Sequence, residues 1–101
     1  MKAISLPHAE ASLLIQGAVP GVYRHRGVPR HMIGRRVVIH CKRTKTSPGF
    51  GLGTVTFGEA RPQDDGRLLW PVTSIERWAE AIVAPGGTGF FNWTGSDEVV
   101  F

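Results

Sequence analysis

The stretch SLLIQGAVPGVYR, residues 12–24, joins the two kinds of element from which we expect this chain to be built. It begins inside an amphipathic helical pattern over residues 8–16, one side of which holds Ala9, Leu13 and Gln16. Gly17 is a natural C-cap for this helix, because a left-handed backbone conformation costs glycine little. After a Val-Pro-Gly turn, residues 21–24 resume as a short strand, so a helix is predicted to lead directly into a sheet.

The rest of the chain shows short alternating apolar runs separated by turns rich in glycine and proline, which is typical of a mainly β domain. Besides residues 21–24, strands are expected at 2–6, 36–41, 52–57, 67–72 and 89–93. Residues 74–83, SIERWAEAIV, are ambiguous, since helical spacing gives them one apolar face whereas strand alternation is poor; we favour a short helix or an irregular strand. The prediction is an α+β, mainly β fold: one domain over residues 1–101, a small barrel or curled sheet of about six strands with one or two flanking helices.

Composition limits the class of protein. The chain is 42% hydrophobic, enough for a core without disulfide or metal support. It contains no run of eighteen apolar residues, so we expect no membrane span, and the N-terminus lacks the apolar block of a signal peptide. The single cysteine, Cys41, suits a reducing compartment and is expected to be a small buried hydrophobe. We therefore expect a cytoplasmic protein.

Charge is distributed unevenly along the chain. Residues 1–45 hold nine lysines and arginines and one acidic residue, whereas residues 46–101 hold three arginines and seven acidic residues. All four histidines also lie in the first part. If the basic residues share one face, they attract polyanions; the alternative is a solvated surface with no partner.

No motif for a metal or a cofactor is present. The histidines, at positions 8, 25, 31 and 40, match no zinc spacing, and GFGLG lacks the lysine and the following helix of a phosphate-binding loop. The sequence therefore predicts no metal ion and no cofactor.

The order of several segments resembles the ASCH domain family, a branch of the PUA-like barrels. These segments are KAISL, ASLLIQG, YR, GRRVVIH, GLGTVTF and PGGTGFFNW, which together run from Lys2 to Trp93. The resemblance implies a PUA-like β-barrel with a cleft lined by the loop after the first helix. It also implies an RNA or modified-nucleotide binder, while a few members of the family are hydrolases.

The chain departs from the family pattern Gly-x-Lys-x-x-Glu-x-Arg. Gly17 and Arg24 match it, but the lysine position holds Val19 and the Glu or Thr position holds Val22. An isopropyl group does no acid–base or nucleophilic chemistry. No catalytic residue is therefore predicted from this motif, and the cleft is expected to remain as a binding site beside Arg24.

Three groups of side chains are candidates for ligand binding. Arg24 either clamps a phosphate or ties its loop to an acid, and Tyr23 either lies against a base or belongs to the core. His40 ends the best strand and is either a site residue or a satisfied sheet histidine, and the basic residues after it could follow a phosphate backbone. On 89–93, alternation places Phe90 and Phe91 on opposite faces. The full set of candidates is Ser12, Tyr23, Arg24, His40, Lys42, Arg43, Lys45, Phe90 and Trp93.

The predicted function is a non-catalytic module that binds RNA or a modified nucleotide in a basic cleft. The alternative is a hydrolase, either a ribonuclease or a nucleoside amidohydrolase, that uses residues outside the family motif. His40, Glu10 and Glu59 are bases for it by residue type only. A third interpretation is a protein-interaction domain whose cleft is filled by Val19 and Val22.

Overall fold

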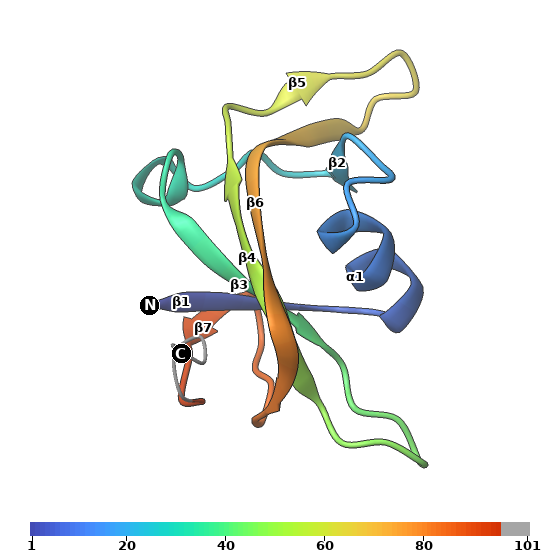
Figure 1. Ribbon diagram of the computed structural model, residues 1–101. Helices are drawn as coiled ribbons and strands as arrows, with labels where there is room; N and C mark the ends of the chain where they lie inside the picture. Colours follow the sequence, from blue (N-terminus) through green and yellow to red (C-terminus); the bar gives the residue numbers. More distant parts are fainter. Residues whose placement is uncertain (96–101) are drawn as a thin grey trace.

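The computed structural model describes residues 1–95, which form one curled sheet with a helix against it (Figure 1). Within those residues no helical segment has the length and apolar content needed to cross a membrane. In chain order the elements are β1 (Lys2–Leu6), α1 (His8–Ile15), β2 (Gly21–Arg24), the 3-10 turn η1 (Arg30–Met32), β3 (Arg36–Cys41), β4 (Phe50–Phe57), β5 (Arg61–Pro62), β6 (Leu68–Val83) and β7 (Phe90–Asn92).

The strands follow the order β2-β6-β4-β3-β1-β7, and β5 pairs with β6 beside this path. All pairs are antiparallel except β1 with β3, which run parallel because α1 and β2 intervene between them in the chain. The predicted mainly β fold, a curled sheet with one α-helix, is confirmed. The predicted strands also form, although β4 starts earlier than expected, at Phe50.

Apolar side chains cover both faces of the sheet. On one face, Val37 and Ile39 of β3 join Phe57, Trp70 and the buried side of α1 in the main core. On the other face, Val38 belongs to a smaller cluster with Ala3, Trp78, Ala84 and Trp93. The alternation expected for 36–41 is therefore confirmed, and β3 is buried on both sides from Val37 onward.

Helix α1 presents a different side to the core from the one marked by Ala9, Leu13 and Gln16. Its buried residues are Ala11, Leu14 and Ile15, while Leu13 is 44% exposed. Apolar residues surround most of this eight-residue helix, so spacing alone does not single out one face. Gly17 ends the helix as expected, with φ of 73°.

Strand β6 resolves the ambiguous segment 74–83, which is strand throughout and contains no helix. Its alternation is poor because the strand bends. Gly53 of β4 pairs with Arg77 of β6 and Gly51 pairs with Ile82, so β6 has more residues than β4 between these two pairs. The extra residues let the strand turn across the sheet, and in Figure 1 β6 runs down the middle of the molecule beside β4. Of the two alternatives for this segment, the irregular strand is confirmed and the short helix was wrong.

Candidate nucleic-acid interface

Arg24, the family-matched arginine, is engaged by helix α1. Its Nη2 lies 2.9 Å from Glu10 Oε1 and its Nη1 lies 3.3 Å from Glu10 Oε2, while Nη1 also donates to the Tyr23 carbonyl at 2.7 Å. The two paired side chains are each 33% exposed. Of the two alternatives for Arg24, the structure shows the one in which this side chain links β2 to an acidic residue. Most of the N–H donors of the Arg24 guanidinium are already hydrogen-bonded within the protein.

The other candidates of the first stretch also have partners inside the protein. Tyr23 is partly exposed, and the Arg67 guanidinium sits 4.5 Å from its ring centroid. Ser12 Oγ accepts a hydrogen bond from Gln16 Nε2 at 2.7 Å. Val22 is buried in the main core and Val19 packs against it. Valine at the two motif positions therefore contributes to packing.

Phe90 and Trp93 are core residues on opposite faces of β7 and its continuation. The Phe90 ring stacks on Trp70 with 5.8 Å between centroids and an interplanar angle of 6°. Trp93 is buried against Trp78, with 5.7 Å between centroids. The expected alternation is confirmed, and the same packing places Trp70 in the main core and Trp78 in the smaller cluster.

Four predicted residues meet at the end of β3. His40, Lys42 and Arg43 line a cavity of about 330 Å³ together with Ser5, Gly49 and residues 85–87. Arg43 also lines an adjoining hollow with Thr44 and Lys45. We call this region, Ser5, His40, Lys42, Arg43, Lys45, Gly49 and residues 85–87, the β3 groove. Among residues 1–95 none that lines these two hollows is acidic, and none of the three cationic side chains has an ion pair or a hydrogen bond.

His40 is the buried floor of the β3 groove, with an exposed fraction of 1%. Its Nε2 lies 2.8 Å from the Ala84 carbonyl oxygen, and its Nδ1 lies 2.8 Å from Ser5 Oγ. A carbonyl oxygen only accepts, so in the neutral ring the proton is on Nε2, and Nδ1 accepts from the Ser5 hydroxyl. Ser5 was missed by the sequence analysis, because its contact with His40 depends on the parallel pairing of β1 with β3, in which these two residues are opposite each other.

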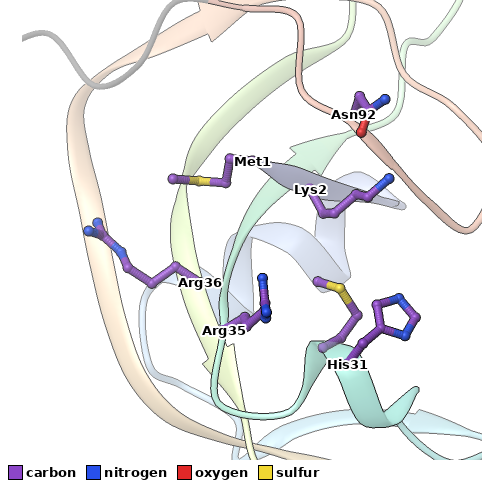
Figure 2. A pocket seen from close by; sticks show the side chains of 7 residues that line it. Met1, Lys2, His31, Arg35, Arg36 and Asn92 are labelled. Atoms are coloured by element: carbon purple, nitrogen blue, oxygen red, sulfur yellow. The ribbon is translucent and has the colours of Figure 1, made fainter.

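A second basic cavity of about 490 Å³ lies at the opposite ends of β1 and β3. Figure 2 shows Lys2, His31 and Arg35 around it, whereas the Arg36 side chain extends away toward β6. Arg36 is held by Glu76 at 2.6 Å, but within residues 1–95 the other three have no ion pair or side-chain hydrogen bond. Met1, Met32 and Asn92 complete the lining. In the sequence these residues stand out only as part of the basic first half, so the uneven charge distribution is the one signal for this cavity.

Cys41 is buried, as expected, and its Sγ lies 3.3 Å from His8 Nδ1. Burial raises the pKa of the Cys41 thiol, so the thiol form is favoured. Within the described part of the chain, no group of three or more His, Cys, Asp or Glu residues is placed to hold a metal ion.

Comparisons with known proteins return no match of any kind: no family model, no curated protein and no solved structure matches the chain. The resemblance to the ASCH family stays a prediction from the residues quoted above.

Proposed function

We propose that this chain is a cytoplasmic module that binds RNA or a modified nucleotide, with the β3 groove as its phosphate-binding site. The observation that carries the proposal is the convergence of Lys42, Arg43 and Lys45 on one pair of adjoining hollows with no acidic residue among the described lining. Nothing within residues 1–95 neutralises these three charges. Their attraction for an anion is therefore available to a ligand.

The shape of the β3 groove suits a nucleotide. Residues 85–87, Pro-Gly-Gly, form one wall, and glycine leaves backbone there without side chains, so that a flat base can approach closely. The Arg43 guanidinium is planar and can donate two parallel hydrogen bonds to a phosphate or stack on a base. Lys42 and Lys45 act as point charges for the neighbouring phosphates.

The site differs from the one that the family resemblance implies. Arg24 is bound to Glu10, so a phosphate there must displace a carboxylate from a guanidinium that already has it at 2.9 Å. The β3 groove requires no such exchange. Binding is therefore expected to depend on Arg43 and not on Arg24.

Fluorescence anisotropy with a short labelled single-stranded RNA tests the proposal. We expect Lys42→Ala, Arg43→Ala and Lys45→Ala each to weaken binding, whereas Arg61→Ala, which removes the same charge from exposed strand β5, leaves the affinity unchanged. Failure of the wild type to bind at low ionic strength, or an equal loss in Arg61→Ala, contradicts the proposal. A titration with a free nucleoside monophosphate in parallel shows whether one nucleotide is sufficient.

A further inference from the structure

We propose that Ser5 and His40 form a nucleophile and base pair, and that the β3 groove hydrolyses carboxylic esters that bear a negative charge. The proposal depends on the proposed function only for the charge of the substrate, because Lys42 and Arg43 hold the anion in both cases. The acyl-transfer chemistry comes from the serine and the histidine.

The geometry is that of an activated hydroxyl. Ser5 Oγ lies 2.8 Å from His40 Nδ1, within the range for proton transfer between a nucleophile and its base. The Ala84 carbonyl holds Nε2 at 2.8 Å and so keeps the ring in the tautomer in which Nδ1 has the free electron pair. A backbone oxygen here occupies the place that a carboxylate takes in a serine hydrolase triad: it orients the ring.

The pair is placed as a reacting group requires. Ser5 is partly exposed and lines the cavity, whereas His40 lies behind it with almost no exposed surface. The base is thereby shielded except on the side of Ser5 Oγ, where the substrate and then the attacking water would enter from the cavity.

Glycine backbone packs closely against the pair on two sides. A Cβ at Gly86 would be 2.7 Å from Ser5 Oγ, and a Cβ at Gly49 would be 2.7 Å from His40 Cε1 and Nε2. A larger residue at position 86 would press on the Ser5 hydroxyl and His40 Nδ1, and one at position 49 would press on the far side of the His40 ring. Glycine at positions 49 and 86 therefore lets the backbone contact the pair directly and hold it in place.

Charge in the β3 groove favours the transition state of ester cleavage. Attack on a carbonyl carbon moves negative charge to the carbonyl oxygen, and Lys42 and Arg43 line the cavity into which that oxygen would be drawn. The same cations select an ester that already has a carboxylate or phosphate over a neutral one.

The reaction balances with water as the only co-reactant. As Ser5 Oγ bonds to the acyl carbon, its proton passes to His40 Nδ1; the bond from carbon to the alcohol oxygen then breaks, and Nδ1 returns the proton to the departing alkoxide. Water next attacks the acyl-serine and gives a proton to Nδ1, the bond from carbon to Oγ breaks, and Oγ takes that proton back. The products are the free acid and the alcohol.

A fluorophosphonate probe and two p-nitrophenyl esters test the proposal on the full chain. We expect one probe adduct by intact mass and, in the tryptic peptide of residues 3–24, fragments that place it on Ser5 and not on Ser12. Ester hydrolysis is expected to fall about 100-fold or more in Ser5→Ala, because the variant lacks the nucleophile and also the proton transfer to His40, and general base catalysis alone contributes about 10²- to 10⁴-fold. Arg43→Ala is expected to slow both esters, and to slow the ester with a carboxylate tail more than p-nitrophenyl acetate, because the tailed ester also loses the cation that binds its carboxylate.

Matched glycine variants separate reactivity from folding. Gly86→Ala intrudes on Ser5, whereas a Cβ at Gly27 meets nothing within 4 Å, so labelling should fall in the first and persist in the second. Circular dichroism shows which variants are folded. A wild type that stays unlabelled, or folded Ser5→Ala that retains hydrolysis, overturns the proposal. The RNA titration is a separate measurement, so a protein that binds RNA without labelling refutes only the esterase.

Discussion

The salt dependence of RNA binding is the sharpest expectation for the β3 groove, because its size follows from the number of free cations. Each phosphate neutralised on a single strand contributes about 0.7 to the slope of log K against log salt. Lys42, Arg43 and Lys45 together predict a slope of about −2. Between 50 and 200 mM salt the affinity should then fall about 20-fold, or roughly 1.8 kcal/mol.

Replacement of one cation should change the slope as well as the affinity. In Arg43→Gln the slope is expected to shrink by about 0.7, and in the triple variant of all three groove cations the salt dependence should nearly vanish. Arg61→Gln lowers the net charge of the chain by the same amount as Arg43→Gln but lies on β5, so its slope should equal that of the wild type. Fluorescence anisotropy at several salt concentrations, with the same labelled RNA, measures all of these slopes.

Two results would refute this reasoning. A wild-type slope near zero means that no phosphate is neutralised, whatever the affinity. If the salt slope is unchanged in Arg43→Gln but smaller in Arg35→Gln, the RNA phosphates bind in the second basic cavity. Arg35 lines that cavity and is also unpaired among the described residues.

Four further expectations concern the scaffold and its thiol. Arg24→Ala should lower the free energy of unfolding by about 0.5–1 kcal/mol in urea titrations, because a partly exposed pair with Glu10 is lost, and should leave RNA affinity unchanged. Phe57→Ala should cost about 3–5 kcal/mol, measured by thermal or urea unfolding, since this ring is fully buried. Gly17→Ala should cost about 1–2 kcal/mol in the same assay, because φ is 73° there. Cys41 should react with iodoacetamide slowly at pH 8 in the native protein and rapidly in urea; burial raises its pKa, so the native thiolate forms only at higher pH than in the unfolded chain.

Each of these expectations has its contrary result. Weaker RNA binding in folded Arg24→Ala would mean that RNA binds in the cleft beside Arg24 that the family resemblance implies. A loss below about 1 kcal/mol in Phe57→Ala would mean that the core closes around the gap. An unchanged stability in Gly17→Ala would show that the helix end relaxes, and fast alkylation of native Cys41 would show that the main core opens at β3.

Local patterns in the sequence were sufficient for most of the strands. The alternation of RVVIHC correctly predicted which of Val37, Val38 and Ile39 share a face, because a strand buried on both sides still has a period of two. Gly17 was equally clear, since its role depends only on the backbone of its own helix. These predictions concern contacts within a few residues along the chain.

What could not be predicted depends on pairing across the sheet. Strand β6 bends because β4 has fewer residues opposite it between two paired positions. The sequence of residues 74–83 contains no information about how many residues the neighbouring strand has there. The Ser5–His40 contact and the Arg24–Glu10 pair arise from a parallel pairing and a helix position that one sequence does not reveal. Basic residues were therefore identified as a group, whereas the question of which cations remain unpaired required the structure.

Strand β6 has a mechanical consequence for the whole molecule. Its first two residues, Leu68 and Leu69, pair with both β2 and β5, the next two pair with β2 alone, and the strand from Val72 onward pairs with β4. Strand β6 thus connects β2 and β5 with β4 and the strands beyond it, so these two parts of the sheet stay joined as long as β6 keeps its place. Amide protons at the β6 residues that pair with β2 or β4 should therefore exchange with solvent more slowly than those of the exposed residues 79–81, which have no partner in the register with β4, and the assembly of such distant partners should make refolding slow for a chain of this size.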